Sequence, residues 1–224
     1  MTRARANGRP APPSAIVFDW DNTLIDSWAA IQDAQNFTLA YFGMKPWTIE
    51  QTRARVRGSM RDTFPAMFGD RWREAGDVFY AHFTEHHLDT LQPLPGAEDM
   101  LADLHARGLP LAVVSNKKGD YLRAEAQRLG WGRFFARIVG AFDAEKDKPA
   151  IEPVRLALAA AGLAPGPRVW FVGDTDIDLE CATNAGCLPV LIRAAPPGPG
   201  EFADHPPALH VSDCMSLLKA VRTL

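Results

Sequence analysis

The sequence predicts an α/β fold in which a doubly wound, Rossmann-like parallel sheet carries an inserted all-helical segment. Short apolar runs recur along the 224 residues, and most of them are separated by helical patterns, which is typical of a parallel sheet covered by helices. One long segment, residues 26–93, has helical patterns and no strand of comparable quality. The expected strands are Ala15–Phe18, Leu109–Val114, Arg137–Phe142, Val169–Val172, Leu188–Ile192 and Ala208–Val211.

The first expected strand, Ala15–Phe18, is apolar at every position, as are strands that are buried on both faces. It runs into the sequence DWDNT, where Asn22 indicates that the chain turns. Because of this turn, we expect the carboxylates of Asp19 and Asp21 to splay apart and to take different roles.

The segment 26–93 is too long to be a loop of a compact domain, so we interpret it as a helical insertion after the first strand. Pro93, Pro95 and Gly96 mark the return of the chain to the sheet. The helices expected in the insertion are Trp28–Phe42, Ile49–Arg57 and Asp70–Leu88.

The later expected helices each stop at a glycine, which readily adopts the left-handed conformation that ends a helix. These helices are Ala97–Arg107, Gly119–Leu129, Ala150–Ala161 and Ile177–Ala185. The predicted organisation is therefore an α/β core of residues 15–25 and 94–224 with a helical domain of residues 26–93. Residues 1–14, which are rich in arginine and proline and contain no acidic residue, are expected to form a disordered tail.

Composition excludes several classes of protein. The net charge of −3 does not indicate a nucleic-acid partner, and no apolar run approaches the roughly 20 residues of a membrane-spanning helix. The three cysteines, Cys181, Cys187 and Cys214, have no zinc-type spacing, and an odd number of cysteines favours a reducing, cytoplasmic compartment. We expect a monomer or a homodimer without nucleic-acid or membrane partners.

Polar side chains follow four of the expected strands. Since the carboxyl ends of parallel strands lie along one edge of a sheet, side chains that are up to 160 residues apart in sequence are expected to converge there. These side chains are Asp19 and Asp21 after the first strand, Ser115 and Asn116 after the second, Lys148 after the third, and Asp174 and Asp178 after the fourth.

Together these groups match what phosphoryl transfer requires. Asp19 and Asp174 offer the hard oxygen ligands that Mg²⁺ prefers. The hydroxyl of Ser115 and the backbone N–H of Asn116 are suited to hold phosphate oxygens, and Lys148 supplies a fixed positive charge. An aspartate nucleophile, a divalent metal, a cation and an anion cradle indicate transfer through an aspartyl-phosphate.

The sequences DWDNT, VVSN, DKPAIEP and GDTDID, in this order, resemble the four motifs of the haloacid dehalogenase superfamily. The insertion 26–93 is similar to the helical cap that this superfamily places after its first motif. Within the superfamily, the chain looks most like the branch of the phosphoglycolate phosphatases and β-phosphoglucomutases.

The resemblance implies a role for each motif residue. Asp19 would attack phosphorus and become the aspartyl-phosphate. Mg²⁺ would be bound by the carboxylates of Asp19 and Asp174 and by the backbone carbonyl of Asp21. The Asp21 carboxyl group would protonate the leaving alkoxide and later activate water.

The remaining motif residues would support these three aspartates. Thr23 and Ser115, together with the N–H of Asn116, would hold the phosphoryl oxygens. Asp178 would hold Lys148 or a metal-bound water.

The helical cap would also influence the protonation of Asp21. A free aspartate has a pKa of about 3.9, so protonation of Asp21 at pH 7 needs a shift of about 3 units, or roughly 4 kcal/mol, part of which an apolar cap could supply by desolvation.

Arg57 and Arg61, in a basic loop between cap helices, are candidates to bind a carboxylate or second phosphate of the substrate, although a solvent-facing turn fits them equally well.

The sequence favours an Mg²⁺-dependent phosphatase that acts on a small, phosphoglycolate-like phosphorylated metabolite. A sugar phosphomutase of the β-phosphoglucomutase type is the alternative, and a non-enzymatic phospho-receiver or binding protein is a more distant one. Dehalogenation and phosphonate hydrolysis are disfavoured because their branches lack the second acid, here Asp21. Phosphonate hydrolases also use a cap lysine that forms a Schiff base, and the segment 26–93 contains a single lysine, Lys45.

Overall fold

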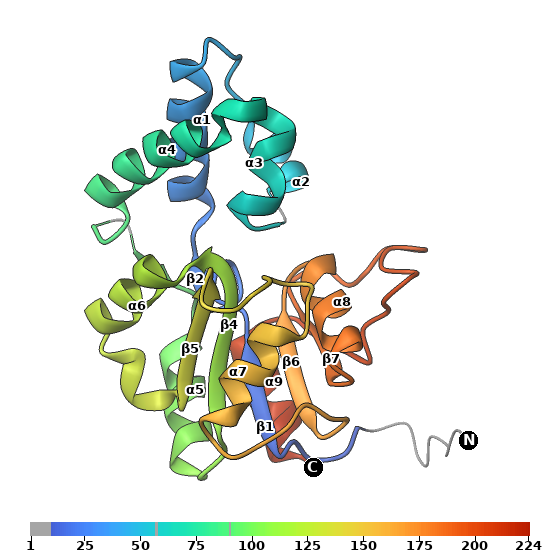
Figure 1. The fold of residues 1–224 in the computed structure, drawn as a ribbon. Coiled ribbons are helices and arrows are strands. Elements are labelled where there is room, and N and C mark those ends of the chain that lie inside the picture. The colour runs from blue at the N-terminus through green and yellow to red at the C-terminus, as the bar shows by residue number, and fades with distance from the viewer. Residues whose placement is uncertain (1–9, 57, 90) are drawn as a thin grey trace.

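The computed structural model describes residues 10–56, 58–89 and 91–224. Its core is a six-stranded parallel sheet with the strand order β5-β4-β1-β6-β7-β8, and a layer of helices stands beyond the carboxyl ends of the strands (Figure 1). The strands are β1 (Ala15–Phe18), β4 (Leu111–Lys118), β5 (Arg137–Ala141), β6 (Val169–Gly173), β7 (Leu188–Ile192) and β8 (Leu209–Val211).

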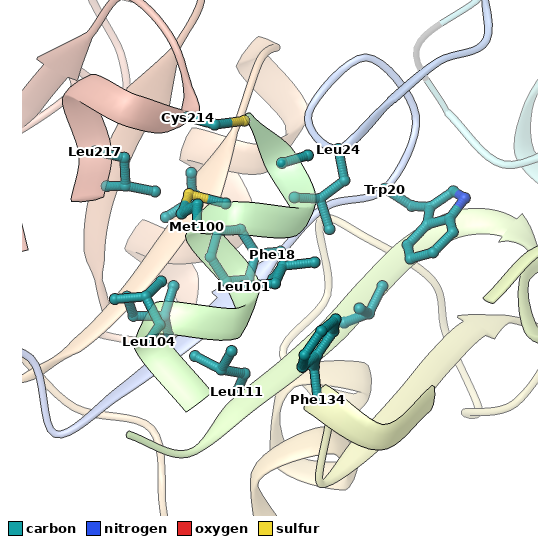
Figure 2. Close-up of a cluster of buried hydrophobic side chains, with 14 of the residues drawn as sticks. Phe18, Trp20, Leu24, Met100, Leu101, Leu104, Leu111, Phe134, Cys214 and Leu217 are labelled. Atoms are coloured by element: carbon teal, nitrogen blue, oxygen red, sulfur yellow. The ribbon is translucent and has the colours of Figure 1, made fainter. Parts of the chain in front are cut away.

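Helices cover both faces of this sheet. On one face lie α5 (Ala97–Ala106), α6 (Gly119–Arg128), the 3₁₀ helix η2 (Trp131–Phe134) and α9 (Cys214–Arg222), and on the other lie α7 (Glu152–Ala159) and α8 (Asp176–Asn184). Strand β1 contributes side chains to the hydrophobic clusters on both faces of the sheet, because side chains alternate along a strand. Ile16 and Phe18 pack into the first cluster, which Figure 2 shows, and Ala15 and Val17 pack into the second.

The direction of the connections reverses between β1 and β6. From β1 the chain proceeds outward through β4 and β5, and it then returns to the other side of β1 to form β6, β7 and β8. In open α/β sheets, ligands bind at the carboxyl ends of the strands at such a point of reversal. The ends of β1 and β6 are therefore the place where a functional site is expected.

The inserted segment forms a helical cap. Its helices are α1 (Trp28–Tyr41), α2 (Ile49–Arg55), α3 (Met60–Phe68) and α4 (Trp72–His86), with a 3₁₀ turn η1 (Gly69–Arg71) before α4. Helix α2 begins with a capping box, in which the side chains of Thr48 and Gln51 each accept a hydrogen bond from the backbone N–H of the other residue. Aromatic side chains, among them Phe64, Phe79 and Phe83, pack between α3 and α4.

A two-stranded antiparallel sheet joins the cap to the core. Strand β2 (Ile25–Asp26) pairs with β3 (Gln92–Pro93), so that the two segments of chain that cross between core and cap lie side by side. These strands were missed by the sequence analysis because two residues are too few to show a period.

All six expected strands of the core sheet are present, and the expected cap and core helices correspond to observed ones within a few residues. Helices α3 and α9 were not predicted, and Arg61, which was expected in a loop, lies at the start of α3. Strand β4 extends beyond the predicted end to Lys118, with an irregular register after Val114. Of the predicted disordered tail, residues 1–9 lie outside the described part of the chain.

None of the helices in the described ranges combines the length and the hydropathy that a helix needs to cross a bilayer.

Candidate active site

Lys148 lies between two carboxylates at the carboxyl edge of the sheet. Its Nζ is 2.6 Å from Oδ1 of Asp19, directly after β1, and 2.7 Å from Oδ1 of Asp178, in the first turn of α8. The Lys148 side chain is only 3% exposed, so these ion pairs are shielded from water. A buried cation thus fixes the orientation of the Asp19 carboxylate.

The loop that carries Lys148 is held by Asn116. The Asn116 side chain donates a hydrogen bond to the backbone carbonyl of Lys148 and accepts one from its backbone N–H, at 3.2 and 3.0 Å. Asn116 lies within β4, and helix α6 begins only at Gly119. The amide side chain of Asn116 therefore positions the lysine loop.

Asp178 is placed by the sharp passage from β6 into α8. Its Oδ2 accepts hydrogen bonds from the backbone N–H and the hydroxyl of Thr175. A Cβ at Gly173 would lie 2.3 Å from the Cβ and Cγ of Asp178, so only glycine leaves room for this carboxylate at the end of β6. Both oxygens of Asp178 are thus engaged, one by this turn and one by Lys148.

Asp21 has different neighbours from Asp19, and the chain turns directly after it, at Asn22. Asn22 adopts φ 61°, in the left-handed region that asparagine tolerates, and its N–H donates to the carbonyl of Ile25. The carboxylate of Asp21 lies 2.7 Å from Nζ of Lys117. Asp19 and Asp21 therefore contact different lysines, Lys148 and Lys117 respectively.

Lys117 is itself part of a buried ionic cluster. Its Nζ contacts both carboxylate oxygens of Glu125, which is fully buried on α6, at 2.8 and 2.7 Å. Burial alone would lower the pKa of Lys117, but the carboxylates of Asp21 and Glu125 outweigh it and raise that pKa. Burial in turn acts to raise the pKa of Glu125, yet Lys117 and hydrogen bonds from His87 and Trp20 bring it below its usual range.

The carboxylates at the carboxyl edge of the sheet are crowded. Burial raises the pKa of Asp19 from 3.8 to about 7, with Asp178 and Asp21 adding to the rise and Lys148 opposing it. Burial, followed by repulsion from Asp178 and Asp19, holds the pKa of Asp174 well above its ordinary value. Negative charge is therefore concentrated here beyond what Lys148 neutralises, and a further cation would relieve it.

A magnesium ion fits this donor set. Carboxylate oxygens of Asp19, Asp174 and Asp178 lie within 4.8 Å of one another, and hard oxygen donors are the ligands that Mg²⁺ prefers. Since Lys148 and Thr175 already engage Asp178, the carboxylates of Asp19 and Asp174 are the candidates to hold the ion.

The crowding predicts a pH-dependent stability of the metal-free protein. Asp19 binds its proton more tightly in the folded protein than in the unfolded chain, so its contribution to stability is fully present below about pH 4. That contribution is lost as the pH rises toward 7 and amounts to roughly 4 kcal/mol at most. Relative to wild type, Asp19→Asn is expected to gain free energy of unfolding from pH 4 to pH 8 in EDTA.

Urea titrations of both proteins across this pH range measure the difference, and saturating Mg²⁺ should diminish it because the ion offsets the repulsion. A difference between the two proteins that does not change with pH would contradict the assignment.

A cavity of about 150 Å³ opens between this edge of the sheet and the cap. The core side is lined by charged and polar residues, among them Asp19, Asp21, Ser115, Lys117, Lys118, Lys148 and Asp174. The cap contributes mostly apolar side chains, among them Trp28, Ile31, Trp47, Met60, Phe64, Met67, Phe79 and Phe83. The cavity therefore has one strongly charged wall and one apolar wall.

The cap is also fastened to the core beside Lys148. Arg61 of α3 forms a two-pronged ion pair with the buried carboxylate of Asp147 and donates to the carbonyl of Ala144. In this structure the Arg61 guanidinium thus binds a carboxylate of the protein itself, and its role in substrate binding stays a prediction. Arg57, the other candidate, lies outside the described residues.

Two further expectations concern Thr23 and Ser115, in the first two motifs. The Thr23 hydroxyl donates to Oδ1 of Asp174 at 3.4 Å, and the Ser115 hydroxyl accepts from the N–H of Lys117 at 3.2 Å while lining the cavity. Trp20 is fully buried among Trp131 and other residues of the core cluster, so it packs in the core and does not form a wall of the cavity.

The cluster of Lys117, Glu125 and His87 was not found from the sequence. Lys117 directly follows the VVSN motif, which is a weak positional signal, but Glu125 and His87 look like exposed residues of ordinary helices. Their burial depends on how α6 packs against the chain that leaves the cap, and this packing leaves no local pattern.

Comparison with known proteins agrees with this geometry. The profile of the haloacid dehalogenase-like hydrolases matches residues 16–192, which is more than half of the chain. The chain belongs to this family. The family resemblance inferred from the four motifs and the expectation of a hydrolase are thereby confirmed.

Two curated relatives and one solved structure illustrate where this hydrolase lies within its family. A phosphoglycolate phosphatase of Aquifex aeolicus is 33% identical over 172 residues, covering 76% of this chain and 80% of that protein. An N-acetylmuramic acid 6-phosphate phosphatase of Pseudomonas aeruginosa is 30% identical over 187 residues, covering 80% of this chain and 81% of that protein. A predicted phosphatase from Clostridium acetobutylicum has the same fold, with a TM-score of 0.83 at 18% identity and coverage of 96% and 100% of the two chains.

Proposed function

We propose that this hydrolase is an Mg²⁺-dependent phosphatase that removes the phosphoryl group of a small phosphorylated metabolite through an aspartyl-phosphate. The observation that carries the proposal is the set of contacts at the carboxyl edge of the sheet. There the Asp19 carboxylate is held by Lys148 at 2.6 Å, and it faces the same cavity as Asp21 and Asp174. The magnesium ion, held by Asp19, Asp174 and the backbone carbonyl of Asp21, would supply positive charge to the phosphoryl oxygens.

In the first step, an oxygen of the Asp19 carboxylate attacks phosphorus, and the bond between phosphorus and the leaving oxygen breaks. Lys148 keeps the other oxygen of Asp19 engaged, so that the nucleophile does not rotate away. The Asp21 carboxyl group gives its proton to the leaving alkoxide. The products of this step are an alcohol, the phosphorylated Asp19 and an ionised Asp21.

In the second step, Asp21 accepts a proton from water as the water oxygen attacks the phosphorus of the aspartyl-phosphate. Inorganic phosphate leaves, and Asp19 and Asp21 return to their starting forms. An apolar cap was expected to supply the environment of Asp21, whereas in this structure the cation of Lys117 contacts its carboxylate.

The substrate proposed is small and phosphorylated, and phosphoglycolate is the first candidate because the Aquifex relative carries that name. A second relative is named for an amino-sugar phosphate, so the leaving group is not fixed by membership of the family. The cavity of about 150 Å³ between core and cap is consistent with a compact leaving group.

We further propose the division into a core of residues 15–25 and 94–224 and a cap of residues 26–93. The paired strands β2 and β3 support these boundaries, since the chain crosses between the two parts there. A cytoplasmic setting is proposed on the chemistry of Cys181, Cys187 and Cys214, which are free thiols.

A panel of phosphate esters tests the proposed activity. Purified protein is incubated with phosphoglycolate, hexose phosphates, amino-sugar phosphates and nitrophenyl phosphate, with Mg²⁺ or with EDTA. Release of inorganic phosphate that requires Mg²⁺ is the expected result. Conversion of a hexose phosphate into its isomer without phosphate release would favour the phosphomutase, and inertness toward the whole panel would contradict both enzymes.

A further inference from the structure

A buried ionic cluster adjoins the proposed active site, and the steps proposed above use only one of its members, Asp21. Lys117 contacts Asp21 at 2.7 Å, and it contacts both oxygens of Glu125. The side chain of Lys117 is 7% exposed and that of Glu125 is fully buried. Lys117 also lies over the ring of Phe83, a residue of the cap helix α4, at 5.4 Å.

Glu125 is bound by three elements of the fold. Besides Lys117 of β4, it accepts a hydrogen bond from Nε1 of Trp20 at 2.7 Å, and Nδ1 of His87 lies 3.1 Å from it. Trp20 stands between the two aspartates of the first motif, and His87 follows the last helix of the cap. Glu125, which anchors Lys117, therefore contacts residues of the core sheet, of the first motif and of the cap segment.

Stability alone does not account for this arrangement. Removing two charges from water is costly, and well-packed apolar residues of similar volume are often as stable as a buried ion pair or more so. What apolar residues do not provide is a cation at a fixed distance from the carboxylate of Asp21. The cluster resembles other buried networks in which one fully satisfied side chain orients the next.

We propose that Lys117, anchored by Glu125, is a positioning residue that holds the Asp21 carboxylate in place for activation of the attacking water. The inference rests on the proposed function, because Asp21 is taken to be the acid and base of that reaction. A carboxylate held by an anchored cation loses less rotational freedom on reaching the transition state, and a misplaced general base forfeits much of its effect.

Nitrophenyl phosphate separates this role from a general structural one. Its leaving group is stable as an anion, so phosphorylation of Asp19 proceeds without a proton from Asp21, whereas hydrolysis of the aspartyl-phosphate still needs a base. For Lys117→Met we expect a rapid burst of about one nitrophenolate per protein, followed by a steady-state kcat on the order of 100-fold below wild type. Asp21→Asn should behave in the same way.

Matched variants distinguish the loss of the contact between Lys117 and Asp21 from a loss of folded protein. Lys117→Met leaves Glu125 without its cation, so the double variant Lys117→Met with Glu125→Gln, which removes both charges, is measured beside it and should give the same burst. Lys117→Arg should restore part of the steady-state kcat, because it returns a cation. Arg128→Met removes a cation from the exposed end of the same helix, α6, and should leave the kinetics unchanged.

Two outcomes would overturn the inference. Wild-type turnover in Lys117→Met would remove any role for the lysine, and a raised KM without a burst would make Lys117 a substrate-binding residue. Crystal structures of wild type and Lys117→Met provide a second test, which does not depend on activity. The Asp21 side chain should move while Asp19 stays on Lys148, and an unmoved Asp21 would also refute the inference. Wild-type protein that is inert toward every phosphate ester would instead refute the proposed function.

Discussion

Asp19→Asn is expected to abolish phosphatase activity, with a fall in kcat on the order of 10⁴-fold or more, while the protein remains folded. An amide has no anionic oxygen to bond to phosphorus, so the aspartyl-phosphate cannot form. The change keeps the shape of the side chain, and the amide oxygen of the asparagine can still accept a hydrogen bond from Lys148, which retains Asp178 as a partner. The loss is therefore chemical in origin.

Two measurements check this expectation. Phosphate release reports kcat, and acid quenching with a labelled substrate should trap a phosphorylated protein for wild type and none for the variant. Asp120→Asn makes the same chemical change at an exposed carboxylate in the first turn of α6, and it should keep wild-type turnover. Normal turnover of Asp19→Asn would show that Asp19 is not the nucleophile.

Lys148→Met is expected to be the most destabilising single change at the site, with a loss of about 3 to 5 kcal/mol in the free energy of unfolding without metal. The lysine is the shared partner of Asp19 and Asp178, whose side chains are 8% and 1% exposed. Without it, these carboxylates and Asp174 would repel one another in a site that water scarcely reaches. Activity should fall as well, because the nucleophile loses the contact that orients it.

Urea titration measures this loss, and a double-mutant cycle assigns its cause. Lys148→Met combined with Asp178→Asn removes one negative charge along with the positive one, so it should be more stable than Lys148→Met alone. Saturating Mg²⁺ should recover part of the stability of the single variant, since the ion supplies the missing charge. A loss of less than about 1 kcal/mol would contradict the electrostatic account.

The parts of the fold that could be predicted are those in which a single segment determines its own environment. Strand β1 is apolar at all four positions because both of its faces are covered, and this made it recognisable as a buried parallel strand. Once the strands were placed, the rule that parallel strands share a carboxyl edge was enough to bring Asp19, Lys148 and Asp174 together.

The parts that could not be predicted depend on contacts between distant segments. Arg61 and Asp147 are 86 residues apart, and nothing near either residue indicates that the arginine of the cap contacts this aspartate of the core. Glu125 is likewise typical of an exposed helical position by sequence, yet Lys117, Trp20 and His87 converge on it from three other segments. A pairing of this kind is decided by how whole elements pack.

The short β2–β3 pair has a consequence for how such a protein acquires a new substrate selectivity in evolution. Ile25 lies opposite Pro93, and Asp26 lies opposite Gln92, so the inserted chain departs from the core and rejoins it at one point. Nothing in the path of the six-stranded sheet needs to be rerouted when the length or sequence of the insert changes. The helical segment is in this sense an interchangeable module, and recombination that swaps it at these two strands would alter selectivity while inheriting the reaction centre intact.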